Sequence, residues 1–172
     1  QNDLQDFEYI EAVDGQNNHF RHITGRKDWI DPFKKRPLQQ SEVACFLSHI
    51  KAWKRCYELN QPCIIMEDDV VINDLYNEDL YKELKQEFVY LQRNENEPSK
   101  TVHLSDLLEI PFYPYNMTAY YLTPAGALRL LQEIDYNDFI PVDEFLPECI
   151  QNGSVIDAAA FKIDHCDQRS RR

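Results

Sequence analysis

No stretch of the sequence approaches the roughly 20 consecutive apolar residues that a helix needs to cross a membrane. A secretory signal is not recognisable either. The first of the 172 residues is Gln, which indicates a processed or trimmed chain. The lack of a signal therefore assigns no compartment.

Basic residues are scarce: 18 Lys and Arg stand against 30 Asp and Glu, a net charge of −12. A general nucleic-acid binder needs a basic surface, so the composition argues against nucleic acid as a partner. It is compatible with a metal-dependent enzyme or with a basic protein substrate. The five cysteines include no CxxC pair, which argues against a zinc ribbon or a redox dithiol. We expect buried free thiols instead.

What the sequence does contain is enough apolar material for a core, at 43% of its residues with 12% aromatic. Residue patterns predict strands at 7–13, 63–66, 88–91, 118–122 and 155–163, and helices from 41, from 81 to 88 and from 124. Residues 16–40 predict a long loop. This order of elements is that of a single α/β domain with a mostly parallel sheet.

Two helix starts carry clear signals. Ser41 is a plausible N-cap, and the helix after it has an apolar stripe at 3.6-residue spacing. Ser48 and His49 lie beside that stripe and are either structural or part of a site. Thr123 caps the later helix with Pro124 at its first position, and Gly126 would be explained by the close approach of a ligand or strand.

The stretch Pro62–Val70 is the one around which the sequence is organised. A short apolar run, typical of a strand buried on both faces, leads directly into Glu67, Asp68 and Asp69. The ends of such strands are where α/β sheets bind ligands, so the acids could hold a divalent cation beside a phosphate-bearing ligand. A solvated acidic turn is the alternative.

Two further charged segments have open interpretations. Asp143 and Glu144 lie in a proline-flanked apolar turn, where burial could raise a carboxyl pKa, or they could simply favour a helix N-terminus. The basic cluster at 34–36 is either a solvated loop or a phosphate contact. Asn116 and Asn152 begin glycosylation sequons.

Six blocks of the sequence resemble glycosyltransferase family 25, in the family's order. They are residues 11–15, 31–38, 41–49 with Trp53, 65–70, 119–127 and 141–147. Together they span about residues 7–165, and the blocks at 31–38 and 141–147 resemble the collagen-modifying branch most.

The resemblance implies a nucleotide-sugar transferase fold of the GT-A type, with helices against a mixed sheet. It also implies a UDP-hexose donor, UDP-galactose or UDP-glucose, a Mn²⁺ or Mg²⁺ cofactor, and inversion at the anomeric carbon. The family's usual first strand is not found, and its catalytic region is cut short after His165. We therefore expect residues 1–172 to be one truncated catalytic domain.

The resemblance and the chemistry of the residues together assign site roles. Asp69 is predicted to bind the metal, with Glu67 at the metal or ribose, Asp68 in support and His165 as a further ligand. Inversion in one displacement needs a base, for which Asp143 is the first candidate and Glu144 the second. On the nucleotide side we expect Asp14, Arg36 and Ser48.

The acceptor would be a hydroxyl group of a glycan or of hydroxylysine in a collagen-like protein, and a homodimer stays open. The compartment would be the endoplasmic reticulum lumen for a eukaryotic collagen-modifying enzyme, or the cytoplasm for a bacterial or viral one. The alternative function is that of a non-catalytic family member that binds a nucleotide or a partner.

Overall fold

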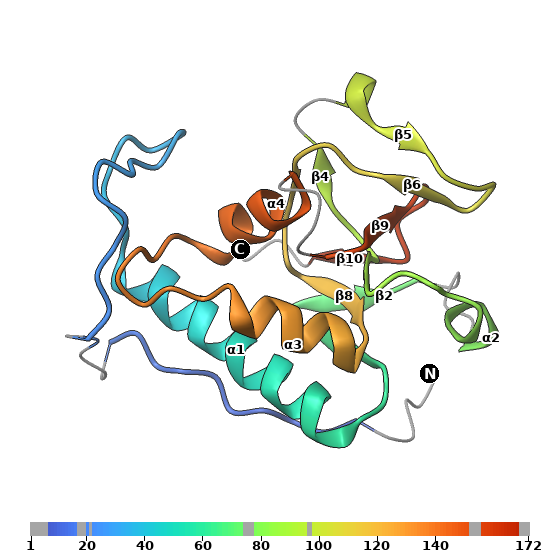
Figure 1. Cartoon of the computed structure of the whole chain (residues 1–172), viewed down its shortest axis with the longest axis horizontal. Coiled ribbons are helices and arrows are strands. Elements are labelled where there is room, and N and C mark those ends of the chain that lie inside the picture. Colours follow the sequence, from blue (N-terminus) through green and yellow to red (C-terminus); the bar gives the residue numbers. More distant parts are fainter. Residues whose placement is uncertain are drawn as a thin grey trace.

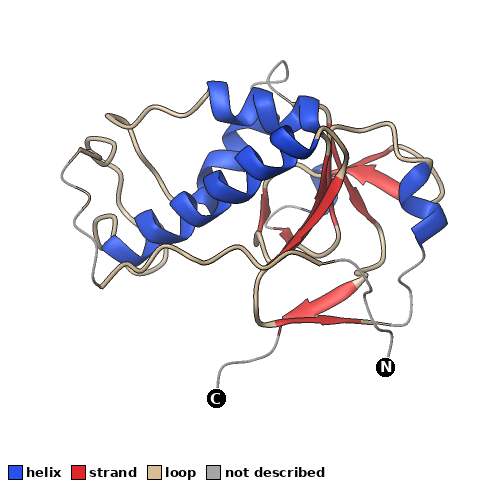
Figure 2. Cartoon of the chain, turned by 90° about the horizontal axis from the view of Figure 1, so that it is seen from below, coloured by secondary structure: helices blue, strands red, loops and turns tan. Residues whose placement is uncertain are grey.

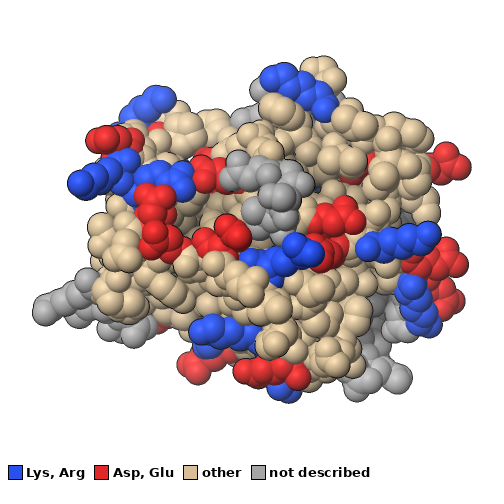
Figure 3. All heavy atoms as spheres, in the orientation of Figure 1, with Lys and Arg blue, Asp and Glu red and all other residues tan. Residues whose placement is uncertain are grey.

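The computed structural model describes residues 7–16, 20, 22–73, 78–95, 98–151 and 156–168. Within these ranges helices pack against a mixed sheet, which confirms the predicted α/β class (Figure 1). None of the helices in this part of the chain is long and apolar enough to span a membrane. Basic and acidic side chains are interspersed on the face shown in Figure 3.

The predicted strand at 7–13 is wrong. In the part of the chain that the structure describes this segment pairs with no strand, and it runs along helix α1 (Figure 1), where Ser48 Oγ accepts the Val13 N–H at 2.9 Å. Arg55 of the same helix forms an ion pair with Glu8 at 2.9 Å. The period-two pattern correctly indicated an extended backbone, but helix side chains replaced the expected partner strand.

Helix α1 (Gln40–Leu59) begins one residue before the predicted cap, Ser41. Gln39 takes the cap position, and the Glu42 carboxylate accepts its N–H at 2.8 Å. Asn60, in the left-handed region at φ 50°, ends the helix. The predicted buried face is confirmed, and its buried residues are Val43, Ala44, Phe46, His49, Ile50, Ala52, Trp53 and Cys56.

The main sheet has six strands in the order β1-β8-β3-β9-β6-β5. Their bounds are Cys63–Met66 (β1), Ala119–Leu122 (β8), Phe88–Tyr90 (β3), Ala158–Phe161 (β9), Leu108–Ile110 (β6) and Val102–His103 (β5). The β3–β9 pair is parallel, and the other pairs are antiparallel. In the described part of the chain the sheet is therefore mixed, but not mostly parallel as predicted.

The orientation of β8 explains this difference. Strands β1, β3 and β9 do run in one direction, but β8 lies between β1 and β3 and runs opposite to both. Strand β1 is accordingly at the edge of the described sheet and only half-buried, whereas a strand buried on both faces was predicted. A short apolar run predicts a strand, but it does not encode which neighbour the strand takes.

Two small antiparallel sheets flank the main one. Strand β2 (Val70–Ile72) pairs with β10 (Cys166–Gln168), and β4 (Asn94–Glu95) pairs with β7 (Pro114–Tyr115). Helix α2 (Glu78–Lys82) is shorter than the predicted helix at 81–88, and a 3₁₀ turn covers Pro98–Lys100. The predicted strand at 155–163 is β9; Val155 lies outside the described residues, as do the sequon at Asn152 and residues 169–172.

Helices α1 and α3 (Pro124–Gln132) lie side by side on one face of the sheet, with α2 on the opposite face (Figures 1 and 2). Strand side chains alternate between the two sides. The first core holds Phe88, Tyr90, Tyr120, Leu122, Ala158 and Ala160 with residues of α1, α3 and α4 (Val142–Gln151). The second holds Val89, Ala119, Tyr121, Ala159 and Phe161 with Tyr81 of α2.

Helix α3 confirms its predicted start. Thr123 Oγ1 accepts the Gly126 N–H at 3.1 Å, and Pro124 is the first helical residue. A Cβ at Gly126 would lie 2.7 Å from the Glu87 carbonyl oxygen, so a neighbouring backbone requires the glycine. Of the two explanations offered for Gly126, a ligand or a neighbouring strand, the structure shows close approach of the backbone that leads into β3.

Candidate functional site

A pocket of about 430 Å³ lies where α1, the end of β1, α4 and the two small sheets meet. Its walls come from segments that are far apart in the sequence. The lining residues are Phe33, Cys45, Glu67, Asn94, Tyr115, Asn116, Met117, Asp143 and Gln168. Two predicted site residues, Glu67 and Asp143, are therefore brought to the same pocket.

Glu67 is placed by the sheet. Its N–H donates to the Thr118 carbonyl at 2.8 Å, which extends the β1–β8 pairing by one residue. The carboxylate turns toward helix α1, where Oε1 lies 3.6 Å from His49 Nε2 and 4.0 Å from Cys45 Sγ. Burial and the charge of Glu67 raise the pKa of the Cys45 thiol to about 12, so the group is a neutral thiol at pH 7.

His49 is held by a chain of buried hydrogen bonds. Tyr120 Oη lies 2.8 Å from His49 Nδ1 and accepts the Trp53 indole N–H at 2.9 Å. Because Tyr120 is fully buried and burial raises its pKa well above the usual range, the hydroxyl keeps its proton. A protonated hydroxyl can donate to Nδ1 or accept from it, so in either tautomer the contact leaves Nε2 as the ring nitrogen that faces Glu67.

Asp143 is the second carboxyl of the pocket wall, and the residue as a whole is exposed to solvent. It lies in the first turn of α4, as expected of an acid that favours a helix N-terminus. Burial raises the pKa of the Asp143 carboxyl, the charge of His49 opposes this, and the charge of Glu67 adds to it. The N–H of Asn116, a residue with φ 83°, also bonds to this carboxyl and favours its charged form.

Glu144, the second candidate base, is engaged elsewhere. Its carboxylate accepts the Tyr113 hydroxyl at 2.5 Å, and it is not among the residues that line the pocket. Adjacent acids on one helical turn thus face different surroundings. The catalytic role of Glu144 stays a prediction, and its position outside the pocket lining supports that role less than the position of Asp143 does.

The predicted metal set does not form one ligand group among the described residues. Asp69 Oδ2 accepts from the Gln168 amide at 3.1 Å, which places Asp69 next to the pocket, and Asp68 is exposed in the turn. His165 Nδ1 lies 3.1 Å from Tyr81 Oη, its ring stacks on Phe161, and burial lowers its pKa. His165 belongs to the second core.

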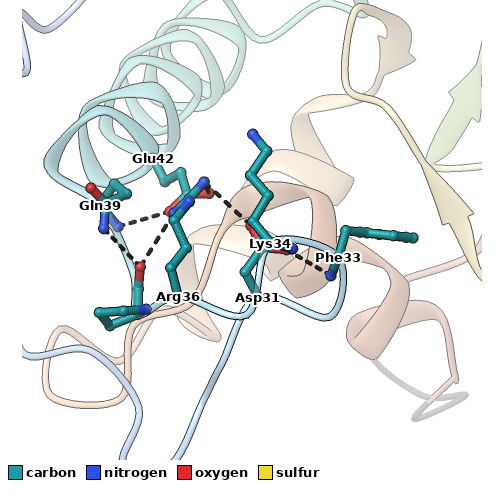
Figure 4. Close-up of polar contacts among 7 residues, drawn as sticks. Asp31, Phe33, Lys34, Arg36, Gln39 and Glu42 are labelled. Carbon is teal, nitrogen blue, oxygen red and sulfur yellow. Dashed lines mark hydrogen bonds and ion pairs between the residues drawn. The ribbon is translucent and has the colours of Figure 1, made fainter.

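The residues predicted on the nucleotide side bind to other parts of the chain. Arg36 donates to both Glu42 carboxylate oxygens at 2.8 and 2.9 Å and forms an ion pair with Asp31 at 3.3 Å (Figure 4). Ser48 Oγ accepts from Val13 and donates to the Ala44 carbonyl at 2.8 Å.

Asp14, the third of these residues, is exposed, and its Oδ1 accepts the Gln16 N–H at 2.7 Å. Their nucleotide roles stay predictions.

Sequence reasoning missed Cys45, and it left His49 undecided. The two residues are four positions apart on a helix and therefore lie on one face, and this spacing could have identified them as a pair. The sequence does not show that Glu67, at the end of β1, lies next to this pair in the folded chain. Within the described ranges, Cys45, His49 and Glu67 are the group of three whose ligand atoms all lie within 4.8 Å of one another.

With this geometry, comparison with known proteins identifies the family. The family model described as glycosyltransferase family 25 (LPS biosynthesis protein) matches residues 1–146. The chain belongs to glycosyltransferase family 25. The resemblance found in the six sequence blocks is thereby confirmed.

Relatives in this family differ in stated activity. A glycosyltransferase 25 family member from Anopheles gambiae is 32% identical over 165 residues, 86% of this chain and 27% of that protein. Human procollagen galactosyltransferase 2 is 30% identical over 156 residues, 80% of this chain and 25% of that protein.

Mouse inactive glycosyltransferase 25 family member 3 is 31% identical over 154 residues, 80% of this chain and 26% of that protein. The chain spans about a quarter of the length of these curated relatives.

Proposed function

We propose that residues 1–172 form a catalytic domain that transfers galactose or glucose from a UDP-sugar to an acceptor hydroxyl, with inversion. One observation carries the proposal: Glu67 and Asp143 meet in one pocket, and burial raises the pKa of Asp143. Membership of the family supports the transferase class. The donor and the acceptor are part of the proposal.

Asp143 is the proposed general base. Inversion by single displacement requires a group that takes the proton from the acceptor hydroxyl as the sugar passes through an oxocarbenium-like state. A carboxylate whose pKa is raised by burial is a stronger base than a solvated one, and Asp143 is such a group at the pocket wall. The Asn116 N–H fixes its orientation.

The oxygen ligands near the pocket fit Mn²⁺ or Mg²⁺, which prefer carboxylates. Glu67 lines the pocket, and Asp69 is bound to the lining residue Gln168. An ion held here together with the diphosphate would neutralise charge on the departing UDP. In this proposal Glu67 and Asp69 bind it, and Asp68 supports them from the turn.

The acceptor is proposed to be a collagen-like protein or a glycan. Support comes from the human relative, which is named a procollagen galactosyltransferase, and from the net charge of −12, which suits a basic protein substrate. The same name favours UDP-galactose over UDP-glucose as the first donor to test.

The test is a donor screen. The full-length protein is incubated with Mn²⁺, one UDP-hexose at a time, and a hydroxylysine-containing collagen peptide or free sugars, and UDP release is measured. One UDP-hexose should give turnover that depends on the acceptor. If every UDP-sugar is inert with the full-length protein, the transferase proposal fails.

A non-catalytic role is the second candidate, because a mouse relative named inactive is as similar to this chain as the human enzyme. The two functions differ in one measurable way. A non-catalytic member would bind UDP or a partner without releasing UDP from any donor, whereas the transferase would do both.

A further inference from the structure

The pocket wall contains a ligand group of which the proposed transferase chemistry uses only Glu67. It consists of Cys45 and His49, four residues apart on α1, and Glu67 at the end of β1. The set combines a thiol, an imidazole and a carboxylate. Mn²⁺ and Mg²⁺ favour oxygen ligands, whereas thiolate with imidazole is typical of Zn²⁺ sites.

The distances suit one small ion. Tetrahedral zinc with bonds of about 2.0 to 2.3 Å places its ligand atoms roughly 3.4 to 3.6 Å from one another. Glu67 Oε1 lies 3.6 Å from His49 Nε2 and 4.0 Å from Cys45 Sγ, and no two of the three ligand atoms are more than 4.8 Å apart. Side-chain rotations that bring these atoms closer by up to about 1 Å would close the set.

The surroundings of the group are also those of a metal site. Tyr120 holds His49 from behind through Nδ1, so Nε2 is the nitrogen presented to Glu67 and Cys45. Binding at Nε2 would leave the imidazole proton on Nδ1, where the Tyr120 hydroxyl oxygen can accept it. This costs at most one buried hydrogen bond, which is small beside coordination by three ligands that include a thiolate.

The fourth coordination position is open to the pocket. Cys45 and Glu67 both line it, and so does Asp143, whose negative charge favours a cation there. Cys45 is half-buried, so an ion can reach it from the pocket. Three protein ligands with one open position distinguish this arrangement from a closed structural zinc site.

We propose that Cys45, His49 and Glu67 bind a borderline-soft divalent ion such as Zn²⁺ or Co²⁺ at the wall of the pocket. Binding displaces the thiol proton, so one proton is released to solvent as the sulfur–metal bond forms. The site does not depend on the transferase proposal, because it would exist in a non-catalytic protein as well. If the chain also binds UDP with Mn²⁺, the two ions share Glu67, and Zn²⁺ should antagonise Mn²⁺.

The experiment is a titration of the chelator-treated 172-residue protein with Co²⁺. A thiolate bound to Co²⁺ gives a charge-transfer band in the near ultraviolet, and tetrahedral Co²⁺ gives strong visible bands. We expect both bands to saturate at one equivalent and to disappear on adding Zn²⁺. The variant Cys45→Ser should lose the charge-transfer band, whereas Cys63→Ser should keep it, because Cys63 Sγ bonds to the Gln61 carbonyl and does not line the pocket.

A second measurement does not require a variant. Zn²⁺ should protect Cys45 from alkylation by iodoacetamide, as located by peptide mass spectrometry, and should leave the labelling of Cys63 unchanged. The proposal is overturned if wild-type protein shows no charge-transfer band, if the band persists in Cys45→Ser, or if Zn²⁺ gives Cys45 no protection. None of these results would affect the donor screen.

Discussion

Two clusters of acids in this molecule have opposite electrostatic surroundings. At the start of α1, Asp31 of the preceding loop and Glu42 of the first helical turn share the guanidinium of Arg36 (Figure 4). The Lys34 N–H bond to Asp31 holds the pKa of that carboxyl below its usual range. Burial would raise the pKa of Glu42, but hydrogen bonds from Arg36 and the Gln39 N–H outweigh it and lower that pKa.

At the pocket wall the balance is reversed. Asp143 is more exposed than Asp31 and Glu42, but desolvation at the pocket wall and the charge of Glu67 raise its pKa against the opposing charge of His49. An acid with an arginine partner therefore serves the fold, while an acid at the pocket wall beside another acid is available for a proton or a cation. Substitutions in the two clusters should therefore have different effects.

The largest expected effect is on turnover in Asp143→Asn. A positioned general base contributes a factor of about 10² to 10⁴, so UDP release with acceptor should fall by at least about 100-fold. UDP binding, measured by calorimetry, should be retained. Glu144→Gln is the matched control on the same helical turn, since its carboxylate is bound to Tyr113.

If Glu144→Gln loses more turnover than Asp143→Asn, the assignment of the base is wrong and the second candidate takes its place.

Next is the buried chain behind His49. Tyr120→Phe leaves Trp53 Nε1 and His49 Nδ1 without the hydroxyl that joins them, and an unsatisfied buried polar group costs about 1 to 3 kcal/mol. Urea unfolding should show a loss in this range. Tyr57→Phe, at an exposed tyrosine of α1, is the control. Equal stabilities for the two variants would mean that this chain does not support the pocket wall.

A smaller effect is expected on stability as a function of pH. Because the pKa of Asp143 is raised from 3.8, the folded protein binds more protons than the unfolded chain in the window above 3.8, and stability falls as pH rises through it. Asp143→Asn removes this penalty, so its melting temperature at pH 7 should exceed that of wild type slightly, since the residue is exposed and solvent screens its charge.

The gain should shrink as pH falls toward 3.8, where the wild-type carboxyl is neutral as well. Thermal scans between neutral pH and this value measure it. A gain that grows on acidification would contradict the raised pKa.

The smallest effect is expected at the loop. Arg36→Gln should lower the melting temperature slightly, because partly exposed ion pairs contribute little. It should also flatten the acid dependence of stability, since the lowered pKa values of Asp31 and Glu42 depend in part on Arg36. Lys34→Gln is the control for loss of one positive charge.

UDP affinity decides the role of Arg36. We expect it to change by no more than about twofold. A tenfold loss would instead support the nucleotide contact that the sequence resemblance implies for Arg36, and would break the distinction between the two clusters.

Local features of the fold could be predicted from the sequence because they depend on neighbours in the chain. The apolar stripe of α1, the strand before Glu67 and the Thr123–Pro124 helix start all lie where they were predicted. The structure also brings Asp143 and Glu67 to one pocket, and the roles assigned to them stay predictions.

Features that depend on distant partners could not be predicted. The segment at 7–13 is extended but lies on a helix, and β8 reverses the direction expected of the sheet. Likewise, the sequence joined His165 to the acids, whereas packing puts it against Phe161 and puts His49 beside Glu67. Periodicity defines a face of an element; it does not define what covers that face.

The most direct measurement is calorimetric binding of UDP in the presence of Mn²⁺ to wild type, Glu67→Gln and Asp31→Asn. If the acids of the pocket form the binding site, Glu67→Gln should weaken UDP binding by about tenfold or more. Asp31→Asn should leave the affinity within about twofold of wild type, because the Asp31 carboxylate serves the loop. Equal losses in the two variants, or a larger loss in Asp31→Asn, would contradict the assignment of the pocket as the site.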